Sequence, residues 1–511
     1  MATVALRSPA GKWILVSSIL ASSMVFIDGS ALNVVLPSLQ KSLQASGADL
    51  FWILNAYLLI LASLILIGGS MGDKLGRKKV FMAGIFIFTC GSVACGFAPT
   101  VLYLIAFRMI QGIGGALMIP GSLSLISSSI NPKERGKAIG TWSAFTTVVT
   151  IGGPVLGGAL GDAGLWRYIF FINVPIGIAA LIMLAFKVNE IKDDNSNSSL
   201  DFPGAITIAL GLSLVTFGFL RMPAVGLHSW QTYLSLIAGV IFLLLFILIE
   251  AKSKNPMIPL PLFKNAMFTG TNLLTLFLYA GLGAGMLFMS LNLVQVQGYS
   301  QLESGLTFLP FTVMMITLAR FAGGLADKHG PRRLLIFGPA TAGLGLLILS
   351  FVKQTNGPAD YWTSFFPGVI VFGLGISFTV APLTTAVMGS VSDQFSGTAS
   401  GVNNAISRVA NVFAVAIFGA LAVLFFTGAL QQQVKTINLN PKQKQEVMAQ
   451  ATNLGNANVP QGIMDSKTIE QAYHQSFIKA YANIMRIASV LGFLGALMAV
   501  LFVKNVKKAA E

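Results

Sequence analysis

The sequence predicts an all-α integral membrane protein with about fourteen membrane-spanning helices. Of its 511 residues 54% are hydrophobic and 10% are charged, whereas a soluble globular protein carries about 25% charged residues. The mean hydropathy is +0.76, which also indicates a chain embedded in a bilayer. The apolar residues are gathered into runs of about 20, the length that a helix needs to cross the hydrocarbon core.

The apolar runs follow one another along the whole chain. The first run is too long for the apolar part of a cleavable signal peptide and contains Asp28, so we expect it to remain as a spanning helix. An even number of spans places both termini on the same side of the membrane. The predicted spans are 13–36, 50–71, 80–98, 101–125, 138–160, 168–186, 203–222, 231–249, 267–294, 304–324, 334–352, 363–388, 399–426 and 480–503.

The basic residues are distributed unevenly between the connections. With the N-terminus in the cytoplasm, roughly twenty Lys and Arg side chains fall in inner segments and roughly nine in outer ones. This asymmetry predicts a multi-pass protein of the cell inner membrane with both termini cytoplasmic. It also explains the net charge of +15 through contact with an anionic lipid bilayer. No nucleic-acid partner is therefore expected.

Three polar connections predict the domain organisation. The Asn- and Ser-rich segment 187–201 and the proline-interrupted segment 251–265 separate apolar runs. We expect an N-terminal six-helix bundle over 1–190, a linker with two inserted helices over 191–265, and a C-terminal six-helix bundle over 266–511. The polar segment 427–478 is predicted to be an external loop, either disordered or with a short surface helix.

A short motif occurs twice, as GSMGDKLGRKK at 69–79 and as GGLADKHGPRR at 323–333. Each copy joins the second and third helices of a predicted six-helix bundle, and repeated bundles are a known transporter architecture. The motif is predicted to hold the two halves together on the cytoplasmic face and to release when that face opens. The alternative is a positively charged turn with a capping Asp. The candidate gating residues are Gly69, Asp73, Gly76 and Arg77 in the first copy, and Asp327 and Gly330 in the second.

Four further segments carry a resemblance to a known family. They are IDGSALNVVLP at 27–37, LIAFRMIQGIGGA at 104–116, IGGPVLGGAL at 151–160 and WRYIFFINVPIG at 166–177. With the repeated loop motif, they make the chain similar to the major facilitator superfamily, specifically its fourteen-helix drug:proton antiporter branch (EmrB/QacA type). The resemblance implies two six-helix bundles plus two inserted helices, and it implies proton-coupled export of drugs. It also implies a hinge or seal at Gly153, Pro154, Gly157 and Gly158, for which plain helix packing is the alternative.

Charged side chains inside the predicted spans are few, and each costs at least about 2.5–3.5 kcal/mol in hydrocarbon. Asp28 is the one acid deep within a run, and burial favours the protonated form of a carboxyl group. We therefore predict Asp28 as the proton-coupling site, with Arg108 as its partner or modulator. The alternatives are a permanently paired, structural Asp28 and an Arg108 that reaches to the outer interface.

A polar stripe on the predicted span 399–426 is the second candidate site. Arg408 and its neighbours suit a water-lined cavity face, and helix–helix hydrogen bonding is the alternative. Arg320 and Arg486 lie near span ends and are expected at the interface. The candidate cavity or substrate residues are Asn33, Gln111, Asn404, Arg408 and Asn411.

The predicted function is a proton-coupled antiporter that exports amphipathic drugs or toxic small molecules. The alternatives are a dedicated exporter of an endogenous metabolite such as a siderophore, an importer, and a receptor or scaffold that does not transport. No enzyme, metal site or cofactor is expected, because His228, His329 and His474 are scattered and no phosphate-binding loop is present. The expected energy source is the proton gradient. The expected partners are a small-molecule substrate, protons and lipid, with a periplasmic adaptor protein as a further candidate.

Overall fold

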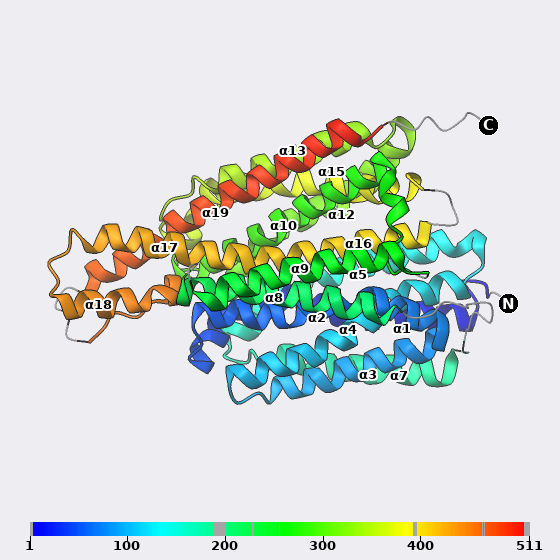
Figure 1. Ribbon diagram of the computed structural model, residues 1–511, viewed down its shortest axis with the longest axis horizontal. Helices are drawn as coiled ribbons and strands as arrows, with labels where there is room; N and C mark the ends of the chain where they lie inside the picture. Colours follow the sequence, from blue (N-terminus) through cyan, green and yellow to red (C-terminus); the bar gives the residue numbers. More distant parts are fainter. Residues whose placement is uncertain are drawn as a thin grey trace. The chain divides into compact units, whose positions relative to one another are not determined.

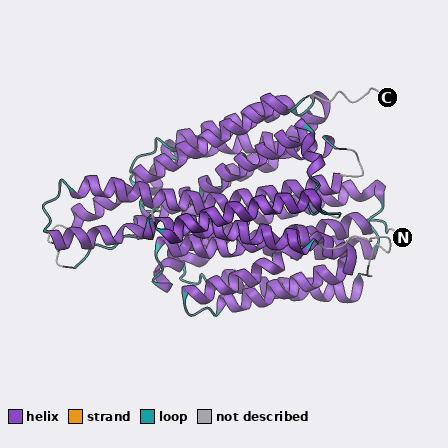
Figure 2. Cartoon of the chain, viewed as in Figure 1, coloured by secondary structure: helices purple, strands orange, loops and turns teal. Residues whose placement is uncertain are grey.

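The computed structural model describes residues 4–188, 190, 201–226, 229–254, 256–391, 396–461, 463 and 466–504. Within these ranges the chain is built from helices and has no β-strand beyond an isolated bridge between Val4 and Ile130 (Figure 2). The predicted all-α membrane fold is confirmed, because thirteen of these helices are long and apolar enough to cross a bilayer.

The helices match the predicted apolar runs in order (Figure 1). In the first half of the chain they are α1 (Pro9–Leu43), α2 (Gly47–Leu75), α3 (Arg77–Gly96), α4 (Val101–Ser129), α5 (Pro132–Asp162), α6 (Tyr168–Phe171), α7 (Asn173–Lys187), α8 (Phe202–Val225) and α9 (Trp230–Lys252). In the second half they are α10 (Ala266–Gln295), α11 (Gln301–Leu306), α12 (Leu309–His329), α13 (Arg332–Leu349), α14 (Tyr361–Ser364), α15 (Phe366–Gly389), α16 (Ser396–Phe413), α17 (Gly419–Val434), α18 (Pro441–Ala449) and α19 (Ser466–Phe502).

The predicted span 138–160 corresponds to α5, which is a single helix of 31 residues with Pro154 inside it. In the part of the chain that the structure describes, α5 contributes a shorter apolar stretch, Val148–Asp162, which stands beside the thirteen spans.

The helices on either side extend into the predicted external loop 427–478. The helix of the preceding span continues to Val434, and α19 begins at Ser466. Between them, the hydroxyl of Tyr473 on α19 donates to the carbonyl of Val447 on α18, and the rings of Phe426 and Tyr473 stack. These helices extend beyond the apolar segment because they pack on one another, a contact that hydropathy does not report.

The chain divides into two compact units that differ from its simple halves. Unit 1 contains Met1–Val35, Trp52–Val215 and Ile237–Pro259, and unit 2 contains Leu36–Phe51, Thr216–Leu236 and Leu260–Glu511. Each unit holds one copy of the repeated loop motif, at the start of α3 and of α13 respectively.

The same kind of helix contact follows the motif in both units. In unit 1, a Cβ on Gly114 of α4 would lie 2.4 Å from the backbone nitrogen of Phe88 on α3. In unit 2, a Cβ on Gly345 of α13 would lie 2.4 Å from the backbone nitrogen of Phe372 on α15. Such spacing requires glycine, because any side chain would overlap the neighbouring backbone. The repeat thus extends from the loop sequence to the packing of the helices after it.

Candidate functional site

Asp28 lies in a closed hydrogen-bonded triangle inside unit 1. The Arg108 side chain donates from one terminal nitrogen to Asp28 Oδ2 and to Gln111 Oε1, the second bond being 2.7 Å. Gln111 Nε2 completes the triangle by donating to Asp28 Oδ1 over 2.9 Å. Asp28 and Gln111 are 0% exposed and Arg108 is 1% exposed. The structure therefore brings Asp28, Arg108 and Gln111 together, and it excludes the alternative in which Arg108 reaches the interface.

Helices α2, α3 and α7 enclose this triangle. On α3, Ser92 Oγ accepts from Gln111 Nε2 over 2.8 Å and from Asn173 Nδ2 on α7 over 3.2 Å. On α2, the Tyr57 ring centroid lies 4.3 Å from the Arg108 guanidinium carbon, in a cation–π contact. Ser92 and Asn173 were not predicted from the sequence, because uncharged polar residues are common in apolar helices. Asn173 lies within the motif WRYIFFINVPIG at 166–177, and this was the one feature of the sequence that pointed to it.

The local sequence explains how a charged pair is accommodated there. Arg108 and Gln111 are three residues apart and so share one face of α4. Directly after them, glycines let other helices approach: a Cβ on Gly112 would lie 2.8 Å from the carbonyl oxygen of Tyr57 on α2. Close backbone approach excludes water from the pair, which strengthens the attraction between its charges.

The chemistry open to this cluster is proton exchange at Asp28. Oδ2 accepts from Arg108 and Oδ1 accepts from Gln111, so a proton bound to this carboxylate would remove the negative charge that pairs with Arg108. Breaking a buried ion pair by neutralising one partner is strongly unfavourable, by about 3–5 kcal/mol, because the other charge stays buried. A change in the charge of Asp28 would therefore favour a rearrangement of the side chains around it.

The residues of the predicted polar stripe on α16 do not share one environment: some contact α10 and others are exposed. Asn403 donates to Asn272 Oδ1 over 3.0 Å and to Thr275 Oγ1 over 2.6 Å, both on α10, so it forms helix–helix hydrogen bonds. Asn404, one residue on, is exposed and bonds to the carbonyl of Ser400 in its own helix.

Arg408 is half-buried and interacts electrostatically with Tyr279 of α10. Its Nε atom is buried and has no hydrogen-bond partner among the described residues. Asn411 bonds to the carbonyl of Ser407, and its Oδ1 lies 2.6 Å from the position of a Cβ on Gly283 of α10. Arg408 and Asn411 thus both lie along α10 in unit 2, whereas Asn33 of unit 1 is half-buried and bonds to the carbonyl of Gly29.

The first copy of the loop motif is tied to the end of α7. Gly76 has a φ of 108°, a conformation that favours glycine, and a Cβ there would lie 2.7 Å from Glu190 Oε1. The Glu190 carboxylate accepts from the backbone nitrogens of Lys78 and Lys79 over 3.0 and 3.1 Å, so it caps the N-terminus of α3. The sequence analysis missed Glu190, since an acid in a polar linker carries no distinguishing signal.

Two further residues of the first motif copy contact α4, and the second copy contains the end of α12. Arg77 donates to the carbonyl of Ser124 on α4 over 3.4 Å, and Gly69 lies beside Pro120 of the same helix. Gly330 ends α12 with a φ of 82°. The side chains of Asp73 and Asp327 lie outside the described part of the structure.

The glycine-rich segment of α5 lies against α1 within unit 1. A Cβ on Gly153 would lie 1.8 Å from Ser30 Oγ, and one on Gly157 would lie 2.4 Å from the carbonyl oxygen of Ala31. Pro154 and Gly158 are also buried. The two glycines bring α5 against the segment of α1 that carries Asp28, so a movement of α5 would be transmitted to the cluster around Asp28.

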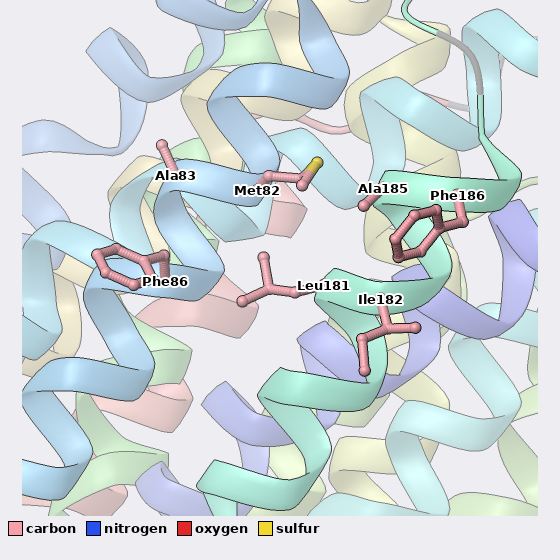
Figure 3. A pocket seen from close by; sticks show the side chains of 7 residues that line it. All are labelled: Met82, Ala83, Phe86, Leu181, Ile182, Ala185 and Phe186. Carbon is pink, nitrogen blue, oxygen red and sulfur yellow. The ribbon is translucent and has the colours of Figure 1, made fainter.

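An apolar groove on the surface of unit 1 has a different character. It lies between α3 and α7, has a volume of about 470 Å³ and opens outward (Figure 3). No polar side chain lines it, so it offers nothing to orient a substrate and is suited to lipid chains. Its lining residues are Met82, Ala83, Phe86, Leu181, Ile182, Ala185 and Phe186.

Curated relatives match nearly the whole chain. The tetracenomycin C resistance and export protein of Streptomyces glaucescens is 29% identical over 93% of this chain and 88% of its own length. The multidrug resistance protein Stp of Mycobacterium tuberculosis is 29% identical over 84% and 79%. The probable actinorhodin transporter of Streptomyces coelicolor is 31% identical over 83% and 74%.

Solved structures and a family model agree with these relatives. A bacterial homolog to the human lysosomal transporter Spinster, in an inward-facing and unoccupied conformation, has a TM-score of 0.68. It is 19% identical and covers 98% of this chain and 100% of its own, so it supports the fold alone. The model described as Major Facilitator Superfamily matches residues 18–415. The predicted resemblance is thereby confirmed: the chain belongs to the major facilitator superfamily and is a multi-pass membrane transporter of small molecules.

Proposed function

We propose that this chain exports amphipathic drugs or toxic small molecules in exchange for protons. The names of its relatives support export, since they include multidrug resistance and antibiotic export proteins. In this proposal the protein lies in the cell inner membrane with both termini in the cytoplasm, as the distribution of Lys and Arg favours.

The observation that carries the proton coupling is the bonding of the Asp28 carboxylate. Its partners are Arg108 and Gln111, both within unit 1 and both buried. In the closed site the charges of Asp28 and Arg108 compensate each other. When water enters the site, Arg108 becomes hydrated, Asp28 loses its counter-ion and a proton can bind.

The protonated cluster keeps a place for the freed arginine. Arg108 retains Gln111 Oε1 as an acceptor, the carbonyl of Ile53 lies 3.5 Å from its Nε, and Tyr57 remains stacked beside it. The same site therefore has two arrangements of unequal proton affinity. In the cycle, the site takes up a proton while it is open to the outside and releases that proton while it is open to the cytoplasm. Substrate is exported in the opposite direction during the same cycle.

The energy available from one proton is of the right size for this step. A potential of roughly 150 mV supplies about 3.4 kcal/mol per proton, at about 2.3 kcal/mol per 100 mV. This is comparable with the cost of about 3–5 kcal/mol for separating a buried pair. One essential carboxyl group is therefore sufficient for concentrative export of a neutral substrate.

A dedicated exporter of a self-made metabolite is the second candidate. It is favoured by the relatives named for tetracenomycin C and for actinorhodin, which are each named for one compound. A riboflavin transporter of Clostridioides difficile, 31% identical over 76% of this chain, keeps import within the alternatives. A periplasmic adaptor protein is a candidate partner in either case, and co-purification with the full chain tests it.

The test is an efflux and susceptibility panel in a strain stripped of its own pumps. We expect the chain to lower accumulation of probes such as ethidium, and we expect Asp28→Asn to abolish this effect while Asp28→Glu retains part of it. Collapse of the proton gradient by an ionophore should abolish efflux by the wild type. Undiminished, gradient-driven efflux by Asp28→Asn would overturn the proposal.

A further inference from the structure

A second pair of acidic groups lies in unit 1, at the open end of the hairpin formed by α8 and α9. Asp201 is the residue before α8, and Glu250 lies in the last turn of α9. Glu250 is 3% exposed, which is unusual for a carboxyl group at a helix end. The sequence analysis did not single out either residue, because each stands next to a polar connection.

Each carboxyl group has one oxygen bound by a backbone N–H. Asp201 Oδ1 accepts from the backbone nitrogen of Gly204 over 2.8 Å and so caps the start of α8. Glu250 Oε2 accepts from the backbone nitrogen of Ile258 over 2.9 Å, in the connection that follows α9. Asp201 therefore fixes the start of α8, and Glu250 fixes the connection that follows α9.

The other two oxygens are buried and face the same point. Asp201 Oδ2 and Glu250 Oε1 have no hydrogen-bond partner among the described residues. A Cβ on Gly204 would lie 2.8 Å from Glu250 Oε1 and 3.0 Å from Asp201 Oδ2, so both oxygens adjoin the space left by this glycine. Among the described charged groups, Asp201 is the one that interacts electrostatically with Glu250.

Two adjacent carboxylates without a donor between them repel each other. A single proton removes this repulsion, because one group becomes a hydroxyl donor and the other accepts from it. We propose that Asp201 and Glu250 form a second proton-binding site, in which one proton is shared between Asp201 Oδ2 and Glu250 Oε1. This inference does not depend on how Asp28 functions.

The shared proton would hold the start of α8 and the end of α9 together. Its release would place two negative charges side by side and loosen the cap on α8 together with the turn after α9. The site would thus make the packing of α8 and α9 sensitive to pH at that face of the membrane, separately from the transport cycle.

The test uses infrared difference spectra of the purified full chain as the pH is raised. We expect the wild type to show the carbonyl stretch of a protonated carboxyl group, which disappears as the shared proton is lost. Glu250→Gln and Asp201→Asn should each lose this band, since an amide N–H takes the place of the proton. Asp28→Asn and Glu303→Gln, which alters a half-buried capping acid of α11, should retain it.

Thermal unfolding in detergent gives a second measurement on the same variants. The wild type should lose melting temperature as the pH rises toward the point where the shared proton is released, because the folded state then holds two repelling charges. Glu250→Gln should remove most of this pH dependence. The proposal is overturned if the band persists in both amide variants, or if sodium ions rather than protons produce the stabilisation.

Discussion

At the scale of single residues, the protein places a full ion pair where hydropathy shows uninterrupted apolar helix. Asp28 and Arg108 are 80 residues apart in sequence, and both are buried in unit 1. Such a pair adds little to stability, but removing one partner leaves a charge without compensation. We propose that a change in the charge state of this pair serves the transport cycle.

A double-mutant cycle tests the strength of this pair. Arg108→Ala should lower the free energy of unfolding by about 3–5 kcal/mol, because Asp28 is left buried and charged. Adding Asp28→Asn should recover part of that loss, since no charge is then left unpaired. Melting temperatures in detergent measure both changes. Losses that simply add in the double variant would mean that the two side chains do not interact as described.

The sequence predicted part of this site, for a physical reason. Charges inside apolar runs are rare enough to single out Asp28 and Arg108, and the spacing on α4 adds Gln111. Ser92 and Asn173 escaped because neutral polar side chains are inexpensive in helices and therefore common. Glu190 could not be found, because its role depends on where the linker after α7 returns to α3.

At the scale of helices, glycine positions set the distance between neighbours. Gly157 of α5 lies against the backbone of α1 at Ala31, three residues beyond Asp28. A backbone neighbour cannot move aside as a flexible side chain can, so any substitution there must displace one helix. The contact connects the glycine-rich segment directly to the part of α1 that carries Asp28.

Gly157→Ala and Gly152→Ala form a matched pair on the same helix. A Cβ at Gly157 would lie 2.4 Å from the Ala31 carbonyl oxygen, whereas a Cβ at Gly152 meets nothing within 4 Å. We expect Gly157→Ala to lower stability by about 1–3 kcal/mol and to reduce efflux at equal expression. Gly152→Ala should change neither, and equal effects of the two would refute the packing argument.

Adjacent asparagines on α16 make a second matched pair. Asn403 donates two hydrogen bonds to α10, whereas Asn404 is exposed and bonds within its own helix. Asn403→Ala should lower the melting temperature, by the equivalent of about 1 kcal/mol, because hydrogen bonds between membrane helices average about 0.6 kcal/mol each. Asn404→Ala should leave it unchanged. A larger loss of melting temperature from Asn404→Ala than from Asn403→Ala would contradict the assignment of the helix–helix hydrogen bonds to Asn403.

Hydropathy located the helices well but not all of their ends. It registers the part of a helix that lies in lipid, and α19 begins with polar turns that pack on α17 and α18 instead. The same limitation applies to α5, whose N-terminal part is charged although the helix is continuous. Helix ends outside the hydrocarbon are set by tertiary contacts, which no window average contains.

At the scale of the whole molecule, the repeated motif and the repeated glycine contact give both units the same construction. The charged chemistry is not repeated: unit 1 holds the Asp28–Arg108 pair, whereas Arg408 in unit 2 has an Nε without a partner among the described residues. This asymmetry supports the proposal that unit 1, through Asp28, is the unit that binds the proton.

The most direct measurement of the central claim is proton movement coupled to substrate in proteoliposomes that contain the purified chain. A pH-sensitive dye inside the vesicles reports protons, and ethidium fluorescence reports the substrate. We expect the wild type to move protons when ethidium is added, and we expect Asp28→Asn to exchange ethidium across the membrane without any proton movement. Proton movement in Asp28→Asn equal to that of the wild type would contradict the account.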